Sequence, residues 1–241
     1  IILNNATTIT GGNYGVSVAN SENVTIERCY VKGLRHAVAT GGDDTKGAVP
    51  CRRILVRFCT LTNVVSTNQH VADFHGNTLN SEYSDCVIEG TVGIGGKDNS
   101  IIRCSLYSEN AVTPILYAEV YGGNINIHNN TITLRKTSTV NGVIGTGSAY
   151  LSGHKYDIEI NVKNNNIIFD YAVRPALVSF IIPSYKSDVS TTNIVVDGNV
   201  FTGLSKIDRF INISTVGTVF KKPTYIYIKN MVVNFTFDFF I

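Results

Sequence analysis

The sequence predicts an all-β protein folded as a right-handed, single-stranded parallel β-helix, a solenoid of about eight coils. Two observations carry this prediction: a pattern that repeats along the chain, and a composition that suits strands joined by polar turns. Hydrophobic residues make up 44% of the 241 residues and charged residues only 16%, below the roughly 25% usual for a soluble domain. The formal net charge of +2 argues against a strongly basic protein that binds nucleic acid.

The repeat consists of an aliphatic or aromatic residue, two further positions, Cys or Asn, one position, and a second aliphatic or aromatic residue. Its Cys or Asn markers are Cys29, Cys59, Cys86, Cys104, Asn130, Asn165, Asn199 and Asn230. The steps between markers run from 18 residues (Cys86 to Cys104) to 35 residues (Asn130 to Asn165). Propeller blades need about 40–45 residues and four strands each, so these shorter steps favour β-helix coils of three short strands.

Each occurrence of the repeat predicts the strands of one coil, with its two apolar residues facing the interior. These pairs are, in chain order, Ile26 and Val31, Val56 and Leu61, Tyr83 and Ile88, Ile101 and Leu106, Ile127 and Ile132, Val162 and Ile167, Val196 and Phe201, and Tyr227 and Val232. Apolar and polar residues alternate in residues 158–162, and residues 225–228 are rich in Tyr and Ile, as expected of strands.

The cysteine markers occupy the same position in successive coils. Their side chains therefore point the same way, which suits neither a tetrahedral zinc site nor facing disulfide partners. We interpret them as small buried side chains that fill a ladder position. Cys51 lies outside this ladder, and the odd total of five cysteines argues against a disulfide framework.

We expect one β-helix domain over residues 1–241, because single solenoids and barrels commonly reach about 200–250 residues. The chain opens with Ile1 and its only methionine is Met231, so we expect a fragment of a longer polypeptide. The longest apolar stretches fall far short of the roughly 20 residues that span a bilayer. No membrane insertion is therefore expected.

Residues suited to catalysis concentrate between Arg35 and Lys97. When adjacent coils are laid over one another, Val38, Phe74 and Ile94 are expected to form one inward row. Strand alternation then turns Asp73 and His75 outward on the same side, about 6.5–7 Å apart.

The expected neighbours of this outward pair are small: Ala37 and Ala39 on one side, Gly93 and Gly95 on the other. Small neighbours would leave a groove wide enough for a substrate. The groups expected to flank that groove are Arg35, His36 and His70 at one end and Lys97 at the other. Cationic groups so placed suit an anionic sugar or a phosphodiester polymer.

The coils that read NVTIERCYV, NSIIRCSL and NINIHNNTI resemble those of the pectate-lyase-like right-handed β-helix superfamily, most of all bacteriophage tail-spike and capsule depolymerase domains. The stretch from Arg35 to Lys97 is similar to a signature of such proteins, roughly R-H-x-x-x-T-G-G, then P-x-R-x-I-x-V, D-x-H and G-I-x-x-[RK]. The matching residues are Arg35-His36, Thr40-Gly41-Gly42, Pro50 with Arg53-Ile54, Asp73-Phe74-His75, and Gly93-Ile94 with Lys97.

The resemblance implies a catalytic site at Arg35, His36, Asp73 and His75, and substrate-binding roles are expected for His70, Lys97, Asp98 and Arg53. It implies a polysaccharide depolymerase, either a lyase or a glycoside hydrolase, that acts on a bacterial surface glycan. It also implies a tail-spike-like parent chain, a virion-tail or extracellular location, and a homotrimer. A phosphodiesterase acting on a teichoic-acid-like polymer and a non-enzymatic glycan-binding adhesin or structural β-helix remain alternatives.

In a lyase, Arg35 or Lys97 would neutralise a uronate carboxylate while His75 or His36 removes the neighbouring proton. A hydrolase needs two carboxyl groups about 5–9.5 Å apart; Asp73 is one, and Asp98, Glu109 and Glu119 are candidates for the other. Our hypothesis makes His75 the general acid or base, Asp73 its orienting or second catalytic carboxylate, and Arg35 the anion clamp.

No cofactor is expected and no metal ligand is assigned among these site residues. Asp43 and Asp44, in a polar loop over residues 40–52, are candidates for calcium ligands, since many pectate lyases of this fold bind calcium; a hydrated turn is the alternative interpretation. An adhesin would instead use exposed tyrosines that stack on sugar rings. The candidates for that role are Tyr107, Tyr117, Tyr121 and Tyr150.

Overall fold

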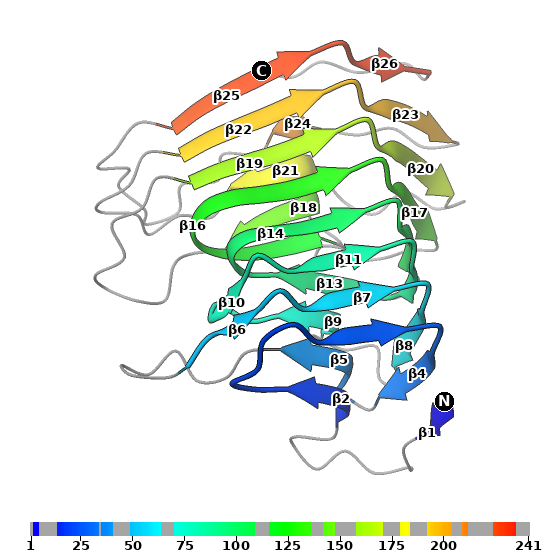
Figure 1. Cartoon of the computed structure of the whole chain (residues 1–241). Coiled ribbons are helices and arrows are strands. Elements are labelled where there is room, and N and C mark those ends of the chain that lie inside the picture. Colours follow the sequence, from blue (N-terminus) through cyan, green and yellow to red (C-terminus); the bar gives the residue numbers. More distant parts are fainter. Residues whose placement is uncertain are drawn as a thin grey trace.

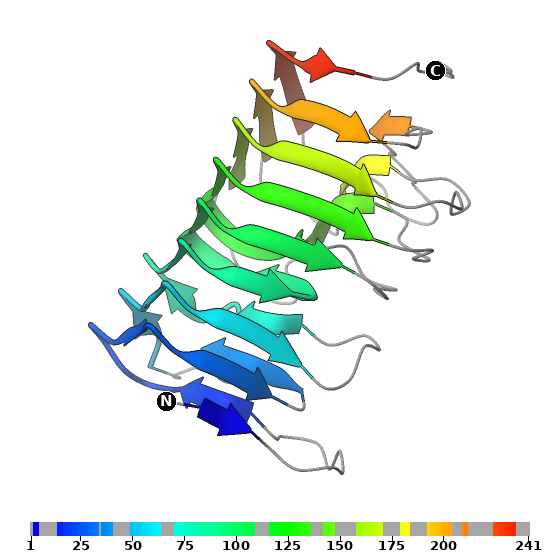
Figure 2. The ribbon, with the colours of Figure 1, turned by 90° about the vertical axis from the view of Figure 1, so that its right-hand side faces the viewer.

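In the structure, a computed structural model, most of the described residues lie in strands. The described residues are 2–4, 14–33, 35–40, 49–63, 70–108, 116–135, 142–147, 158–170, 179–183, 192–203, 209–211 and 224–234. Among these residues, no helix is long and apolar enough to cross a membrane. Every strand pairing in the described part is parallel, and the strands stack coil upon coil along one axis (Figures 1 and 2). The prediction of a right-handed parallel β-helix is confirmed.

The strands form three faces, which we call the first, second and third sheets. The first sheet contains β1 (Ile2–Asn4), β4 (Tyr30–Gly33), β8 (Thr60–Asn63), β12 (Val87–Glu89), β15 (Ser105–Ser108), β17 (Thr131–Arg135), β20 (Asn166–Asp170), β23 (Val200–Gly203) and β26 (Val232–Val233). The second sheet contains β2 (Tyr14–Val18), β5 (His36–Thr40), β9 (His70–Phe74), β13 (Thr91–Ile94), the first part of β16 (Leu116–His128), β18 (Gly142–Gly147), β21 (Ser179–Pro183) and β24 (Arg209–Ile211).

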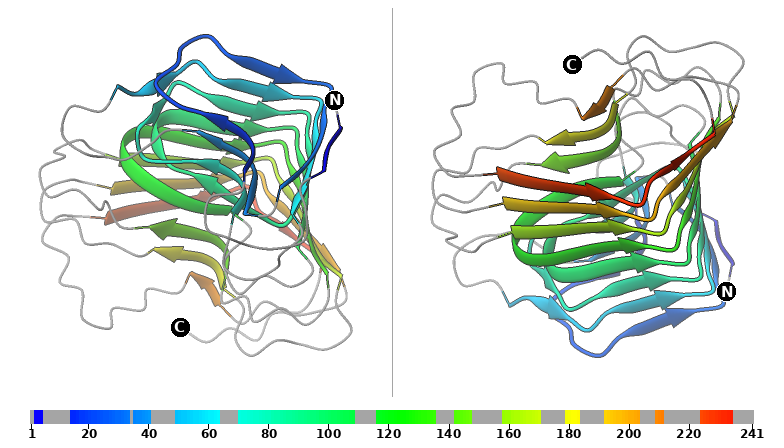
Figure 3. Two further views of the ribbon diagram at one scale, coloured as in Figure 1. Left: turned by 90° about the horizontal axis from the view of Figure 1, so that it is seen from below. Right: turned by 90° about the horizontal axis from the view of Figure 1, so that it is seen from above.

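The third sheet completes each coil. It contains β3 (Thr25–Glu27), β6 (Cys51–Arg52), β7 (Leu55–Arg57), β10 (Thr78–Leu79), β11 (Glu82–Ser84), β14 (Gly96–Ile102), the second part of β16, β19 (Ile158–Lys163), β22 (Thr192–Asp197) and β25 (Thr224–Lys229). Figure 3 looks along the stacking axis, where the strands of successive coils overlie one another. The strands β1 and β2 precede the first sequence repeat, and they pair with β4 and β5.

The repeat corresponds to the turn from the third sheet to the first. Its apolar pairs lie in continuous register from Ile26 and Val31 to Val196 and Phe201. The last coil differs from the prediction, because Ile228, Met231 and Val233, not Tyr227, Asn230 and Val232, occupy the repeat positions. Asn230 instead has a φ of +51°, in the turn. Asn is common at this left-handed position, so the sequence pattern alone does not distinguish Asn230, in the turn, from the marker position that Met231 occupies.

The markers form a buried polar ladder. Asn165 accepts a hydrogen bond from the Asn130 backbone N–H at 2.9 Å and donates one to the Ile127 carbonyl at 2.9 Å. Asn199 repeats the arrangement on the backbone of Asn165 at 2.9 Å. Each amide thus satisfies backbone groups that the turn would otherwise leave unpaired.

The cysteines continue the ladder as free thiols. Cys86 donates to the Val56 carbonyl at 3.5 Å and to the Ser84 carbonyl at 3.3 Å. A side-chain hydrogen bond with Cys104, together with burial, raises the pKa of the Cys86 thiol to about 12. Cys51 lies off the ladder as predicted, fully buried, with its thiol directed to the Val18 carbonyl at 3.3 Å.

The register of the second sheet differs by two residues from the prediction in one coil. Phe74 lies beside Ile94 as expected, but beside Thr40 in place of Val38, which pairs with Ala72. A shift of two leaves the inward and outward faces unchanged, so alternation alone does not detect it. The register shifts again between Thr91 and Val92, which leaves Val71 as an extra residue in β9.

Candidate active site

The candidate site lies on the outer face of the second sheet, where β5, β9 and β13 are adjacent. Phe74 points into the core and stacks on Tyr83, with ring centroids 3.9 Å apart. Alternation along β9 therefore turns Asp73 outward. The strand neighbours of Asp73 are Ala39 on one side and Gly93 on the other, so the carboxylate lies between two residues with almost no side chain.

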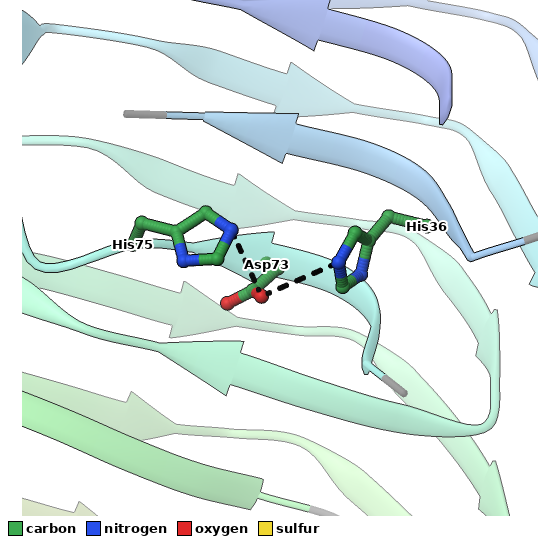
Figure 4. Close-up of side chains that lie close together, drawn as sticks. All are labelled: His36, Asp73 and His75. Atoms are coloured by element: carbon green, nitrogen blue, oxygen red, sulfur yellow. Dashed lines mark ion pairs between the residues drawn. The ribbon is translucent and has the colours of Figure 1, made fainter. Parts of the chain in front are cut away.

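Three imidazoles converge on the Asp73 carboxylate. Its Oδ2 lies 3.3 Å from Nδ1 of His70, 3.3 Å from Nε2 of His75 and 3.8 Å from Nε2 of His36. Figure 4 shows His36 and His75 turned towards this carboxylate from opposite sides. The structure thus brings together four residues named in the sequence analysis: His36, His70, Asp73 and His75. His36 and His70 were expected only at one end of the groove, but both lie against Asp73.

The four side chains of the cluster differ in how much of their surface is exposed to solvent. The relative exposure is 2% for His36, 6% for Asp73, 14% for His70 and 34% for His75. Solvent therefore reaches the carboxylate from the side of His75, and a substrate would meet His75 first.

Gly93 is required beside the carboxylate. A Cβ at this position would overlap Oδ1 of Asp73 and would press on Nδ1 of His70. The side chains of Asp73 and His70 thus occupy the space that a residue on β13 would otherwise fill. The expectation of a small neighbour is confirmed at this position. The small residue makes room for the side chains of Asp73 and His70 themselves.

His36 is enclosed and oriented. Its Nδ1 hydrogen-bonds to the backbone carbonyl of His70, and its ring stacks on Tyr14 at 5.2 Å and 11°. Its Nε2 is buried without a hydrogen-bond partner. Burial lowers the pKa of His36 to about 4, so the ring is neutral near pH 7.

Asp73 is ionised despite its burial. Burial acts to raise the pKa of Asp73, but a hydrogen bond from His70 and the positive potential of the histidines outweigh it, and the pKa lies below its usual value. The carboxylate is thus available as a hydrogen-bond acceptor, an orienting group or a metal ligand.

Arg35 lies beside this cluster through Tyr14. Its Nη1 donates to the Tyr14 hydroxyl at 3.4 Å, and its guanidinium lies 5.9 Å from the centre of the Tyr14 ring. Sequence analysis missed Tyr14, because this residue precedes the first repeat and only the pairing of β2 with β5 places it on His36.

The remaining predicted residues lie at turns and strands of the third sheet. Arg53 bonds to Glu22 at 2.7 Å and to Asn23 at 2.7 Å. Asp98 accepts from the Asn124 backbone N–H at 3.0 Å. Both have local partners that hold the coils together, so we do not include them in the cluster around Asp73.

Lys97 lies at the start of β14, with Leu79 and Gly122 as strand neighbours. Tyr107 is half-buried on β15. Other predicted groups fall outside the described residues or have side chains that are not described: Asp43, Asp44, Glu109, Glu119, Tyr117, Tyr121 and Tyr150.

Three residues of the cluster are also arranged to hold a metal ion, although sequence analysis assigned none. One ligand atom each from His36, Asp73 and His75 lies within 4.8 Å of the others. Two imidazoles and a carboxylate, with solvent access on one side, suit either proton transfer or metal coordination.

Comparison with known proteins agrees with this architecture. The profile of a family described as Gp49, pectin lyase-like, matches residues 2–235. Among curated proteins, none matches the chain. The tailspike protein gp49 of Pseudomonas phage LKA1 is 26% identical, with a TM-score of 0.72 over 92% of this chain and 38% of its own.

Two further tailspikes share the fold. Gp54 of Acinetobacter baumannii bacteriophage AP22, solved in complex with A. baumannii capsular saccharide, is 23% identical, with a TM-score of 0.73 over 99% of this chain and 39% of its own. The tailspike gp61 of Pseudomonas phage phi297 is 18% identical, with a TM-score of 0.59 over 92% of this chain and 40% of its own. The present chain thus spans about two fifths of each tailspike it matches.

Proposed function

Because the chain belongs to the Gp49 pectin-lyase-like family, we propose that it is the β-helix domain of a phage tailspike that binds and cleaves a bacterial surface polysaccharide. One observation carries the proposal beyond the fold: a buried carboxylate, Asp73, surrounded by three imidazoles of which one is open to solvent. A cluster of this kind on an outer sheet is typical of proton-transfer sites.

We assign proton removal to His75. It is the most exposed histidine of the cluster, and its Nε2 lies 3.3 Å from Oδ2 of Asp73. Asp73 would orient the imidazole and stabilise the imidazolium that forms, as the carboxylate does in other His–carboxylate pairs. General base catalysis of this kind contributes roughly 10²–10⁴-fold to a rate.

The assignment of Arg35 follows from charge. Removal of a proton next to a uronate carboxylate builds negative charge on that carboxylate, which a nearby guanidinium stabilises. The contact of Arg35 with Tyr14, whose ring stacks on His36, supports a position beside the groove. His36 and His70 then act as positioning residues, since His36 is enclosed and His70 hydrogen-bonds to Asp73.

The groups around Asp73 favour a lyase over a glycoside hydrolase. Glycoside hydrolysis uses two carboxyl groups that flank the bond, whereas the described partners of Asp73 are imidazoles. Cleavage of a phosphodiester would use the same histidines with Arg35. The product therefore decides among the three reactions.

Assembly and location are part of the same proposal. The neighbouring structures are phage tailspikes, and one of them is in complex with a capsular saccharide. We propose a homotrimer in the virion tail with a bacterial surface polysaccharide as partner, and residues 1–241 as one domain of the chain. Mass measured by light scattering tests the assembly, and a monomer contradicts it.

The activity is tested with a panel of bacterial capsules, lipopolysaccharides and teichoic acids. Polymer length and the ultraviolet absorbance of unsaturated uronates are followed for the native protein, Asp73→Asn and His75→Ala. Asp85→Asn changes a half-buried carboxylate that is paired with Arg103, and it serves as the matched control. We expect shortening with new absorbance, lost in the two site variants and kept in the control.

The other outcomes are equally informative. Shortening without absorbance indicates a hydrolase or a phosphodiesterase. Binding without shortening indicates an adhesin. Full turnover by Asp73→Asn overturns the assignment of the site.

A further inference from the structure

We propose that His36, Asp73 and His75 bind one divalent transition-metal ion, for which zinc is the best-matched probe. The ligand atoms are Nε2 of His36, Oδ2 of Asp73 and Nε2 of His75. The inference goes beyond the proposed function, because it concerns what these residues bind. It describes a state of the site in which His75 is a metal ligand through Nε2, and in that state His75 does not act as the general base, because the neutral ring then carries its proton on Nδ1.

The spacing of the three atoms suits a small cation. Zinc binds imidazole nitrogen at about 2.0–2.1 Å, so two ligands of a tetrahedral site are about 3.3–3.4 Å apart. Oδ2 of Asp73 lies 3.3 Å from Nε2 of His75 and 3.8 Å from Nε2 of His36. One ligand atom from each of the three residues falls within 4.8 Å of the others, so small side-chain rotations would close the site.

The tautomer of His36 provides the second argument. A carbonyl oxygen only accepts hydrogen bonds, so Nδ1 of His36 carries the proton in its bond to the His70 carbonyl. With the ring proton on Nδ1, the lone pair of Nε2 is available to a metal ion. Nε2 is buried without a hydrogen-bond partner and lies 3.8 Å from Oδ2 of Asp73. A cation between these two atoms would accept an electron pair from each.

The groups that hydrogen-bond to the proposed ligands also match those of known metal sites. Metal-binding histidines almost always donate their other ring N–H to a carbonyl or carboxylate, and metal-binding carboxylates are themselves hydrogen-bonded. Both supports come from one residue here: the His70 carbonyl holds His36, and the His70 imidazole hydrogen-bonds to Asp73. His70 is thus a positioning residue for both buried ligands.

The donor set selects the class of ion. Calcium prefers six to eight oxygen ligands, whereas two imidazoles and one carboxylate match zinc and its neighbours in the first transition series. His75 is 34% exposed, so the fourth coordination position faces solvent. A water molecule or a substrate oxygen would fill it.

Metal binding is tested on tag-free, EDTA-treated protein. Zinc chloride is titrated by calorimetry, and bound zinc is counted by mass spectrometry after gel filtration. We expect one zinc per chain, with affinity reduced at least about tenfold in His75→Ala and in Asp73→Asn. His128→Ala is the matched control, because Nε2 of His128 is also buried without a hydrogen-bond partner but lies on β16, outside this cluster.

A spectroscopic measurement keeps the test decisive if buried variants fold poorly. Cobalt(II) should give visible absorption in the native protein and in His128→Ala, and should lose it in His75→Ala, whose half-exposed side chain is the safest of the three to remove. Failure of the folded native protein to bind zinc or cobalt overturns the inference, as does unchanged binding in both site variants. Zinc binding without polymer cleavage overturns only the proposed function, whereas cleavage without metal binding overturns only this inference.

Discussion

The polar ladder and the Asp73 cluster both bury polar groups in the same solenoid, but they satisfy them differently. In the ladder, Asn130, Asn165 and Asn199 repeat one arrangement, and each side chain bonds to the backbone of a neighbouring coil. In the cluster, residues from different positions of β5 and β9 meet once, and one buried nitrogen on His36 has no hydrogen-bond partner. Repetition therefore identifies the stabilising polar groups, and the break in repetition identifies the candidate functional ones.

The largest expected effect tests whether the ladder thiols are chemically silent. Hydrogen bonding to Cys104 and burial raise the pKa of Cys86 from 9.0 to about 12. At pH 8 the thiolate fraction then falls by about a thousandfold. A disulfide reagent should label Cys86 only after unfolding in urea, as peptide mapping would show. Fast labelling of Cys86 in the folded protein would contradict the interpretation that the ladder thiols are structural and unreactive.

The second largest effect is expected when one asparagine side chain of the polar ladder is removed. Asn165→Ala leaves the Asn130 backbone N–H and the Ile127 carbonyl without their partners. Because each buried unpaired group costs about 1–3 kcal/mol, we expect a loss of about 3 kcal/mol in the free energy of unfolding, measured with urea. Asn126→Ala, half-buried on the third sheet, is the control, and an equal loss in both variants would argue against the ladder.

A third change targets the cluster. Gly93→Ala places a methyl group against Asp73 and His70, so we expect turnover and zinc binding to fall by at least about tenfold and stability by about 1–3 kcal/mol. The reciprocal variant, Ala39→Gly, alters the opposite neighbour without a clash. If the two variants behave alike, the space over Gly93 is not what positions the carboxylate.

The smallest effect concerns exposed charges that belong to neither region. Arg103 lowers the pKa of Asp85, so the pair stabilises the fold above the unfolded pKa of about 4 and loses that contribution as pH falls through the lower folded pKa. Asp85→Asn should change the Tm at pH 7 by about 2 °C or less, and by less as the pH falls through the lowered pKa of Asp85. A larger change at pH 7 would show that surface pairs rival the ladder.

Sequence predicted the regular region better than the cluster. The ladder repeats, so its coil order and inward residues followed from the pattern, except where Asn230 stood one residue before the true marker Met231. Asp73 and His75 were placed outward by alternation. The register of β5, the contact of His36 with Asp73 and the role of Tyr14 depend on hydrogen bonds between coils, which no periodicity encodes.

The stacking of coils also makes the Asp73 cluster structurally independent of the coils far from it. Tyr14 comes from β2, His36 from β5, and His70 and Asp73 from β9, with His75 directly after β9. Gly93 of the next strand, β13, lies beside them, so the whole cluster is contained within residues 14–94. Each coil of a solenoid contacts only its neighbours, so the coils beyond β16 can change without disturbing Asp73. Exchange of the distal coils between related chains should therefore leave the arrangement of side chains around Asp73 unchanged.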